Sequence, residues 1–392
     1  MTPAARIQAS IEILDLVIEA ATSGGAPADR LIAEWFRAHR FAGSKDKRAI
    51  REHVYDAIRA CGPVPPSGRA AMLRLAATQP DLRDLFDGSQ YGPAGIAPDE
   101  QVADGGVAPT WLVEKLAQSE IVGEEAEALL DRAPLDLRIN TLRADPEAVD
   151  LPLAGEPAPA PGALRFPAGT PVEQWDAWEQ GLIEVQDAGS QLACAAVAAQ
   201  PGETVIDLCA GAGGKTLALA AAMQNEGTLI ASDTDRGRLS RLAPRAGRAG
   251  ATIAEARLLN PGREGEVLGD LVGKADAVLV DAPCSGTGTW RRNPEARWRL
   301  SDKQLAQYTQ VQARLLGMAS MLVRPGGRLV YVTCSLLDEE GAAQLDAFLS
   351  RLEGWNADDI SALGGEPRGQ GIRLNPYRHG TDGFFIARLS RL

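Results

Sequence analysis

The sequence of 392 residues predicts an α/β fold, in which a parallel sheet covered by helices on both faces follows an all-α region. From about residue 204, apolar β-rich runs alternate with helical stretches; the runs are TVIDLCA, GTLIASD, ADAVLVDAP and GRLVYVTCS. This alternation is typical of parallel strands that are joined by crossover helices. Before it, helical spacing dominates, and we find no internal repeat.

The first 60 residues are helical in pattern. The run RIQASIEILDLVIEA has apolar residues at spacings of three and four, at Ile7, Ile11, Leu14 and Ile18. A second helix is predicted from Pro27 to about His39, and KDKRAIREHVYDAIRA predicts a third. Residues 62–110 predict short helices joined by loops rich in Gly and Pro. The first strand-like run is LDLRINTLR at 135–143, and a Pro-rich loop follows it.

These changes in pattern predict three segments. We expect a helical domain with a linker over 1–125, a small α+β segment over 126–195 and the α/β domain over 196–392. The content of 45% hydrophobic and 23% charged residues is that of a soluble globular protein. No apolar run reaches the length of about 18 residues that a membrane span requires, and the first residues lack the layout of a signal peptide.

The five cysteines are widely separated and include no CxxC pair, and the chain has only three histidines. A structural zinc site or a disulfide framework is therefore not expected, and we expect a reducing, cytoplasmic compartment.

Charge is unevenly distributed along the chain. The net charge of −12 counts against nonspecific binding to nucleic acid. Residues 31–60 nevertheless carry seven Lys/Arg against four acidic residues, which is either a solvated face or a binding surface. A second cluster, which follows a cysteine loop and therefore favours a functional role, comprises Arg291, Arg292, Arg297 and Arg299 with Trp290 and Trp298. Such local patches favour a specific polyanionic partner.

The run VIDLCAGAGGKT at 205–216 predicts a strand, a glycine-rich turn and a helix. A nucleotide-triphosphate loop requires glycine where Cys209 stands, and a dinucleotide fingerprint requires glycine where Thr216 stands. An acidic residue at the end of the next strand, Asp233, is suited to a ribose hydroxyl. The pattern favours an adenosine ligand without a phosphate chain, such as S-adenosylmethionine. The alternative is a tight turn that binds no ligand.

Two cysteines occupy equivalent places at the ends of predicted strands. The strand in AVLVDAPC ends at Asp281, and Pro283 then stops the pairing and presents Cys284. VTCS repeats this arrangement with Cys334. One such cysteine is more often a small buried hydrophobe. Two of them, with Asp281 and Lys215 at the same edge of the sheet, favour a functional site.

Methylation of a pyrimidine at C5 is a reaction that uses these groups. A thiolate that adds to C6 makes C5 electron-rich, and C5 then attacks the methyl group of a sulfonium. A carboxyl group at the ring N3 would stabilise the adduct, and a nearby lysine would help to lower the pKa of the thiol. The target base must leave its stack to enter such a pocket.

Several motifs of the chain match those of a known family. DAPCSGTG with RRNP, VTCSLLDEE, QDAGSQLA and DGFFIARL are specific when they occur together. The chain resembles the RNA cytosine-5 methyltransferases of the Fmu/Sun (RsmB-like) group, which act on small-subunit ribosomal RNA, over nearly its whole length. The resemblance implies a Rossmann-like S-adenosylmethionine-dependent methyltransferase domain, preceded by an all-α NusB-like domain. Between them it implies a small α+β RNA-recognition segment that begins near LRINTLR.

The resemblance also implies roles for single residues. Cys334 attacks C6, Cys284 helps to release the product, and Asp281, near Lys215, hydrogen-bonds the cytosine and lies near the cofactor. The implied cofactor-binding residues are Cys209, Ala210, Gly211, Ala212, Gly213, Gly214, Lys215, Asp233 and Asp281. We also expect Arg138, Arg291 and Arg292 to bind the RNA. We expect a monomer that binds RNA, most simply 16S rRNA, with no metal and no membrane partner.

Two features of the chain depart from the family pattern. The cofactor loop of the family is usually Cys-Ala-Ala-Pro-Gly-Gly-Lys, whereas this chain has CAGAGGK. Arg257 stands near the place where the family has an acidic residue close to the adenine. Either Asn260 or a backbone group makes that contact, or the adenine binds differently.

Two other functions are weighed against this one. A DNA cytosine-5 methyltransferase would have a Glu-Asn-Val motif downstream of PCSGTG, and this chain has none. A non-catalytic RNA-binding or antitermination-like factor with a degenerate methyltransferase domain is the contrasting class. The intact set of Asp281, Cys284, Cys334 and Lys215 argues against that class.

Overall fold

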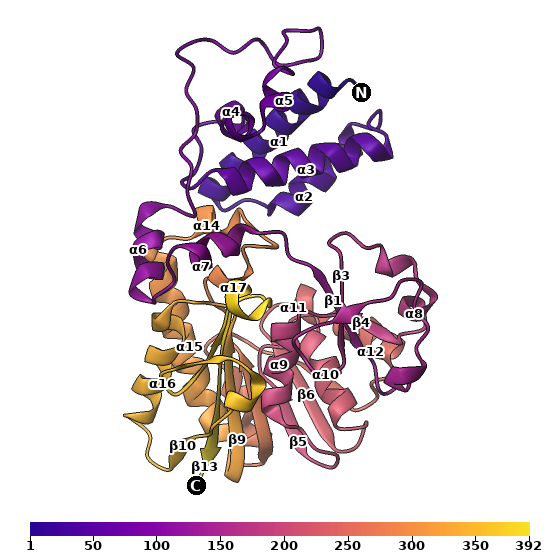
Figure 1. The fold of residues 1–392 in the computed structure, drawn as a ribbon. Helices are drawn as coiled ribbons and strands as arrows, with labels where there is room; N and C mark the ends of the chain where they lie inside the picture. Colours follow the sequence, from indigo (N-terminus) through magenta and orange to yellow (C-terminus); the bar gives the residue numbers. More distant parts are fainter. The chain divides into compact units, whose positions relative to one another are not determined.

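The computed structural model describes residues 1–392, with the side chain of Glu147 left aside. The chain divides into two compact units (Figure 1). The helical unit comprises Met1–Asp131 and Thr289–Ser301, and the sheet unit comprises Arg132–Gly288 and Asp302–Leu392. The predicted fold class, an α/β domain after an all-α region, is confirmed. The segment Thr289–Ser301 lies deep in the sequence of the predicted third segment but groups with the helical unit.

The helical unit has a core that is built around its first helix. Its elements are α1 (Pro3–Ser23), α2 (Ala28–Ala38), α3 (Ser44–Ala60), α4 (Gly68–Thr78), α5 (Pro80–Arg83), α6 (Thr110–Gln118), α7 (Glu124–Glu127), η1 (Ala128–Leu130) and α14 (Ala296–Arg299). The Thr2 side chain caps α1, and Gly24 ends it in the left-handed conformation. The predicted apolar face of α1 packs inward, with Ile7 and Leu14 fully buried. None of the described helices is long and apolar enough to cross a membrane.

The segment Thr289–Ser301 completes the packing of the helical unit. Arg297 is fully buried and donates to the carbonyl oxygens of Ile58 and Cys61, each at 2.6 Å. These carbonyls are at the end of α3, where the helix itself supplies no donors. Trp298 is 5% exposed, and Glu295 accepts a hydrogen bond from the backbone N–H of the first residue of α2. Two members of the predicted arginine–tryptophan cluster, Arg297 and Trp298, therefore hold helices together.

The sheet unit begins with a small antiparallel sheet. Its strand order is β2-β3-β1-β4, with bounds β1 (Leu135–Ile139), β2 (Glu156–Pro157), β3 (Ala163–Phe166) and β4 (Ile183–Val185). The strand predicted in LDLRINTLR is β1, and it ends at Ile139. The short helical elements of this region are η2 (Pro146–Ala148), η3 (Val172–Gln174) and α8 (Asp176–Glu179).

The large sheet has the order β11-β12-β13-β9-β8-β5-β6-β7, and β10 pairs with β13. Its strands are β5 (Thr204–Asp207), β6 (Thr228–Asp233), β7 (Ala254–Leu258), β8 (Ala275–Asp281), β9 (Val323–Thr333), β10 (Trp355–Ala357), β11 (Glu366–Arg368), β12 (Gly371–Leu374) and β13 (Phe384–Arg391). Neighbours from β9 to β7 are parallel, and β13 is antiparallel to β9. The strand order reverses at β5, between β8 and β6, and in sheets of this kind ligands bind outside the carboxyl ends of the strands at such a point.

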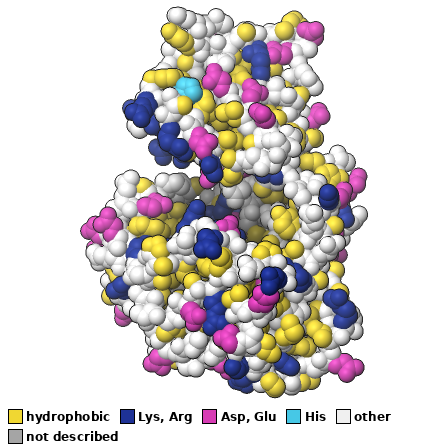
Figure 2. Space-filling view, turned by 180° about the vertical axis from the view of Figure 1, so that it is seen from behind, with side chains coloured by type: hydrophobic (Ala, Val, Ile, Leu, Met, Phe, Trp, Pro, Cys, Tyr) yellow, Lys and Arg dark blue, Asp and Glu magenta, His cyan; other side chains and the backbone are white. Residues whose placement is uncertain are grey.

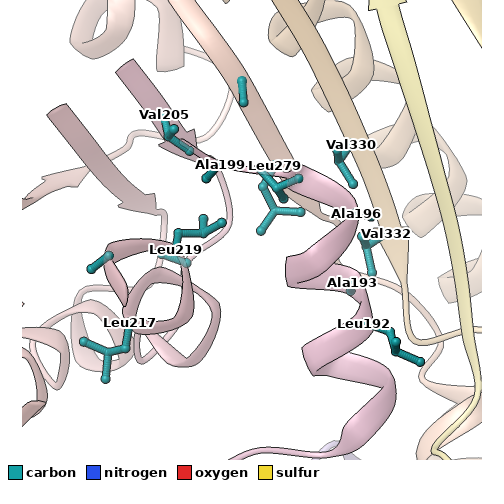
Figure 3. Close-up of a cluster of buried hydrophobic side chains, with 14 of the residues drawn as sticks. Leu192, Ala193, Ala196, Ala199, Val205, Leu217, Leu219, Leu279, Val330 and Val332 are labelled. Carbon is teal, nitrogen blue, oxygen red and sulfur yellow. The ribbon is translucent and has the colours of Figure 1, made fainter. Parts of the chain in front are cut away.

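Helices cover both faces of this sheet (Figure 1). On one face lie α9 (Ala188–Val197), α10 (Gly214–Ala222) and α12 (Leu242–Ala249), and on the other lie α15 (Asp302–Leu322) and α16 (Ala342–Leu349). Figure 3 shows Ala196 of α9 beside Leu279 and Val330 of the sheet. The remaining helical elements are α11 (Arg236–Leu239), α13 (Glu264–Leu268), η4 (Gly269–Leu271), η5 (Thr287–Thr289), η6 (Asp338–Glu340), η7 (Ser361–Leu363) and α17 (Pro376–His379).

Candidate active site

The two predicted cysteines meet at the carboxyl ends of adjacent strands. β8 runs parallel to β9, with Asp281 opposite Val332. Cys334 directly follows β9, and the Sγ atoms of Cys284 and Cys334 are 3.4 Å apart. The backbone N–H of Gly288 donates to the carbonyl oxygen of Cys334 at 3.0 Å, so the two loops are joined on both sides of the sulfur pair. The pairing of β8 with β9 thus brings together side chains that are 50 residues apart in the sequence.

A buried glutamate connects the two cysteine loops through hydrogen bonds. Glu340 is fully buried, and its Oε1 accepts hydrogen bonds from the backbone N–H of Ser285 at 2.8 Å and from Gln312 at 3.0 Å. Its other oxygen accepts from the hydroxyl of Ser285, which lies 3.2 Å from the hydroxyl of Ser335. Burial raises the pKa of Glu340, against the effect of these hydrogen bonds. Sequence reasoning missed Glu340; the Cys-Ser pair that occurs in both loops was the available signal.

The Cys284 thiol lies in a sheltered place beside Cys334. The hydrogen bond to Cys334 and then burial raise the pKa of Cys284 well above its ordinary value. Both side chains are half-buried, so they are sheltered without being closed off from a ligand.

Lys215 and Asp281 form an ion pair at the same edge of the sheet. The Lys215 Nζ lies 2.6 Å from Asp281 Oδ2. Burial acts to lower the pKa of Lys215, but the attraction of Asp281 outweighs it, so this pKa is raised and the ammonium stays charged. Lys215 Nζ also lies 5.7 Å from the ring centroid of Phe384, in the C-terminal motif DGFFIARL. The predicted grouping of the carboxylate and the lysine is thus present in the fold.

The predicted cofactor loop joins β5 to α10 through two left-handed glycines. Gly211 has φ +56° and Gly213 has φ +88°, a region that residues with a Cβ rarely adopt. The backbone N–H of Gly211 donates to Asp233 Oδ2 at 2.8 Å, which connects the loop to the end of β6. A Cβ added to Gly214 would meet no atom within 4 Å, so the first turn of α10 borders open space. Cys209, Ala210, Ala212 and Lys215 complete this loop.

Asp207 ends β5 beneath the same loop. It is fully buried, and its Oδ2 accepts a hydrogen bond from the Thr216 hydroxyl at 2.7 Å, whereas its Oδ1 has no partner among the described residues. Burial raises the pKa of Asp207 to about 7. A glycine loop, an acidic group at the end of β6 and open space before a helix fit an adenosine ligand that lacks a phosphate chain.

Arg257 is engaged within the chain. Its guanidinium donates to Glu255 at 2.8 Å and to Asp270 at 2.7 Å. The hydrogen bond to Asp270 contributes most to raising the pKa of Arg257. The side chain at this unusual position is therefore held by carboxylates on β7 and on η4.

The three predicted RNA-binding arginines lie in different surroundings. Arg138 on β1 is half-buried and donates to Gln186 Oε1 at 2.9 Å, and burial lowers its pKa. Gln186 in turn lies 3.5 Å from the Cys194 sulfur. Arg291 and Arg292 belong to the helical unit, where Arg291 is 6% exposed and Arg292 is half-buried. A role of these three side chains in RNA binding stays a prediction.

Comparison with known proteins connects this geometry to one family. Residues 194–390, half of the chain, match the family described as 16S rRNA methyltransferase RsmB/F. The ribosomal RNA small subunit methyltransferase B of Citrobacter koseri is 36% identical over 293 residues, which cover 72% of this chain and 66% of that protein. The chain thus spans about two thirds of the length of that relative.

Two solved structures have the same fold. The crystal structure of PH0851 aligns over 100% of this chain and 99% of its own, with a TM-score of 0.75 and 27% identity. A methyltransferase homolog protein from Pyrococcus horikoshii aligns over 72% of this chain and 99% of its own, with a TM-score of 0.61 and 27% identity. The predicted membership of the Fmu/Sun (RsmB-like) group is confirmed, and the chain belongs to the 16S rRNA methyltransferase RsmB/F family.

Proposed function

We propose that this chain transfers a methyl group from S-adenosylmethionine to C5 of a cytosine in RNA, with 16S rRNA as the substrate. The observation that carries the proposal is the pair of thiols, 3.4 Å apart, at the ends of β8 and β9. The Lys215–Asp281 ion pair at the same edge and the family membership support it further. One reactive thiol suffices for attack on C6, and a second one beside it is suited to proton transfer during release of the product.

The loop from Cys209 to Lys215, with Asp233 at the ribose, would hold S-adenosylmethionine, whose methyl group would leave the sulfonium and form a bond to C5 of the cytosine. Cys334 attacks as the thiolate, and its sulfur forms a bond to C6 of the cytosine. Asp281 hydrogen-bonds the edge of the base, and the Lys215–Asp281 pair supplies the proton that N3 takes up as charge develops. The resemblance of the motif VTCS to that of the family supports Cys334 as the nucleophile.

Release of the product requires the loss of the C5 proton and cleavage of the bond between C6 and sulfur. Cys284 relays one proton in this step: its thiol donates to the departing sulfur of Cys334 as its own sulfur accepts the C5 proton. N3 returns its proton to the Lys215–Asp281 pair. Methyl transfer releases one proton overall, and the Cys334 thiol loses this proton to solvent, which restores the thiolate. Glu340 contributes by holding both loops at the distance that this relay needs.

Transfer of a tritiated methyl group to unmodified 16S rRNA tests the proposal. The purified chain should label the RNA, and bisulfite sequencing should locate the product at a cytosine. Absence of transfer by folded protein, on naked rRNA and on small-subunit assembly intermediates alike, would favour a non-catalytic RNA-binding factor. Cys334→Ala is the matched control, because it removes one sulfur atom from a half-buried position.

A further inference from the structure

A cavity lies in the helical unit, and neither cysteine of the candidate active site lines it. Its volume is about 800 Å³. The walls come from the first turns of α1, the end of α2, the loop that follows α2 and the loop at 90–92. Its lining residues are Met1, Thr2, Ala5, Gln8, Ala9, Glu12, Trp35, His39, Phe41, Gln90, Tyr91 and Gly92. The reaction proposed above makes no use of this cavity.

Four of the twelve lining residues carry aromatic rings. The rings of Trp35 and His39 are stacked, with centroids 3.9 Å apart and an interplanar angle of 12°. Phe41 meets His39 edge to face at 5.7 Å. Phe41 and Tyr91 are each 68% exposed, which is unusual for large rings in a soluble protein. Exposed rings beside a stacked pair offer flat surfaces to another planar group.

One wall of the cavity is polar. Gln8 and Glu12 lie one turn apart on α1, and the Gln8 amide donates to the Glu12 carboxylate at 3.3 Å. A carboxylate that lines an aromatic cavity can accept hydrogen bonds from an amino group on a planar ligand. The wall therefore favours a ligand that is flat and carries such an amino group.

The segment 31–60, which carries the lining residues Trp35, His39 and Phe41, has an excess of positive charge. Every acidic residue in 31–60 is ion-paired: Glu34 with Arg30, Asp46 with Arg6, Glu52 with Arg48 and Asp56 with Arg59. The exposed cations that have no ion pair among the described residues are Arg37, Arg40, Lys45, Lys47 and Arg51. Figure 2 shows Lys and Arg side chains gathered beside a histidine at one edge of the helical unit.

These cations are close to the cavity along the chain. Arg40 stands between His39 and Phe41, which both line it. Lys45 and Lys47 flank Asp46, whose carboxylate lies 3.3 Å from the backbone nitrogen of Met1, another lining residue. In a chain with a net charge of −12, this is a local site for a polyanion.

We propose that this cavity binds an unpaired base of the RNA substrate by stacking, while the neighbouring cations hold the adjacent phosphates. The proposal rests on the proposed function insofar as that function supplies the RNA. Stacking on aromatic side chains combined with a basic surface is how proteins bind single-stranded nucleic acid. A protein partner would need the apolar rings but not the five cations of segment 31–60 that have no ion pair among the described residues. The Glu12 carboxylate predicts tighter binding of cytosine, which has an exocyclic amino group, than of uracil, which has none.

Fluorescence anisotropy with short oligocytidine and oligouridine RNAs, and with an unmodified 16S rRNA transcript, tests the proposal. Phe41→Ala and Tyr91→Ala should each raise the Kd for RNA by about 5- to 10-fold, the weaker end of the effect of losing one stacking ring. Arg40→Gln with Lys45→Gln should make the dependence of Kd on salt less steep. The matched controls, Leu16→Ala on α1 and Arg30→Gln in its ion pair with Glu34, should bind as the wild type does.

Cross-linking identifies the site directly. A transcript that contains 5-iodocytidine, a photoreactive analogue that keeps the exocyclic amino group, should cross-link to the peptides that carry Phe41 and Tyr91. Unchanged Kd values in both aromatic variants, or cross-links confined to the sheet unit, would overturn the proposal. It is also overturned if the variants lose binding to small-subunit ribosomal proteins and keep binding to naked RNA. All binding is measured without a methyl donor, so it does not depend on methyl transfer. If the chain binds RNA at Phe41 but transfers no methyl group, the proposed function is wrong and the proposal for this cavity still holds.

Discussion

Replacement of Asp207 by asparagine should remove a pH dependence from the stability of the sheet unit. Asp207 is fully buried at the end of β5, and burial raises its pKa from 3.8 to about 7. Because the folded pKa lies above the unfolded one, the contribution of this group to stability is complete below about pH 4. It is lost as the pH rises through the folded pKa.

The size of the effect follows from the two pKa values of Asp207. The difference between about 7 and 3.8, at about 1.4 kcal/mol for each tenfold change in proton affinity, gives about 4 kcal/mol. The wild-type chain should lose roughly this free energy of unfolding between about pH 4 and pH 8 because of this one group. Asp207→Asn cannot ionise, and its carbonyl oxygen keeps the hydrogen bond from Thr216, so the variant should retain the stability.

Urea unfolding of the wild type and of Asp207→Asn across this pH range measures the difference. The free energy of unfolding of Asp207→Asn should exceed that of the wild type by a growing amount as the pH rises. Asp276→Asn is a control of opposite sign: burial acts to raise the pKa of Asp276, but hydrogen bonds from the backbone N–H of Thr204 and from Arg324 outweigh it and lower this pKa. Parallel pH profiles for the wild type and Asp207→Asn, with a clear effect of Asp276→Asn, would refute the reasoning.

Three further predictions concern the candidate site. Glu340→Gln places an amide among donors, so urea unfolding should show a loss of about 2–4 kcal/mol for the disrupted hydrogen bonds, and kcat should fall more than KM changes. Gly213→Ala forces a Cβ into φ +88° and within 2.3 Å of a leucine; calorimetry should show loss of S-adenosylmethionine binding. Mild oxidation with diamide should join Cys284 to Cys334, seen as a reversible loss of activity and of free thiols, because their sulfur atoms are 3.4 Å apart. An unchanged kcat in Glu340→Gln would contradict the first expectation, and wild-type affinity of Gly213→Ala for S-adenosylmethionine the second. An unchanged number of free thiols after treatment with diamide would contradict the third.

Much of the fold was predictable because its signals are local. The alternation of apolar strands and helices marked β5, β6, β8 and β9, and the ends of β8 and β9 placed the two cysteines at one edge. The rule that ligands bind at the carboxyl ends of parallel strands then grouped Asp281 with Lys215, as the structure has them.

The features that could not be predicted depend on contacts between distant residues. Glu340 acts on Ser285 from 55 residues away, and only the parallel pairing of β8 with β9 brings them together. Arg297 and Trp298 looked like part of a basic surface because composition cannot reveal burial. Arg297 instead satisfies backbone carbonyls of α3, more than 200 residues earlier in the chain.

Covalent trapping on RNA tests the central claim, the division of labour between the two thiols, most directly. Wild type, Cys284→Ala and Cys334→Ala are each incubated with S-adenosylmethionine and unmodified 16S rRNA, then resolved on a denaturing gel. Cys284→Ala should accumulate a protein–RNA complex, because Cys334 still attacks C6 but the product is not released. Cys334→Ala should form neither the complex nor methylated RNA. A trapped complex with Cys334→Ala and none with Cys284→Ala would contradict the account and reverse the two roles.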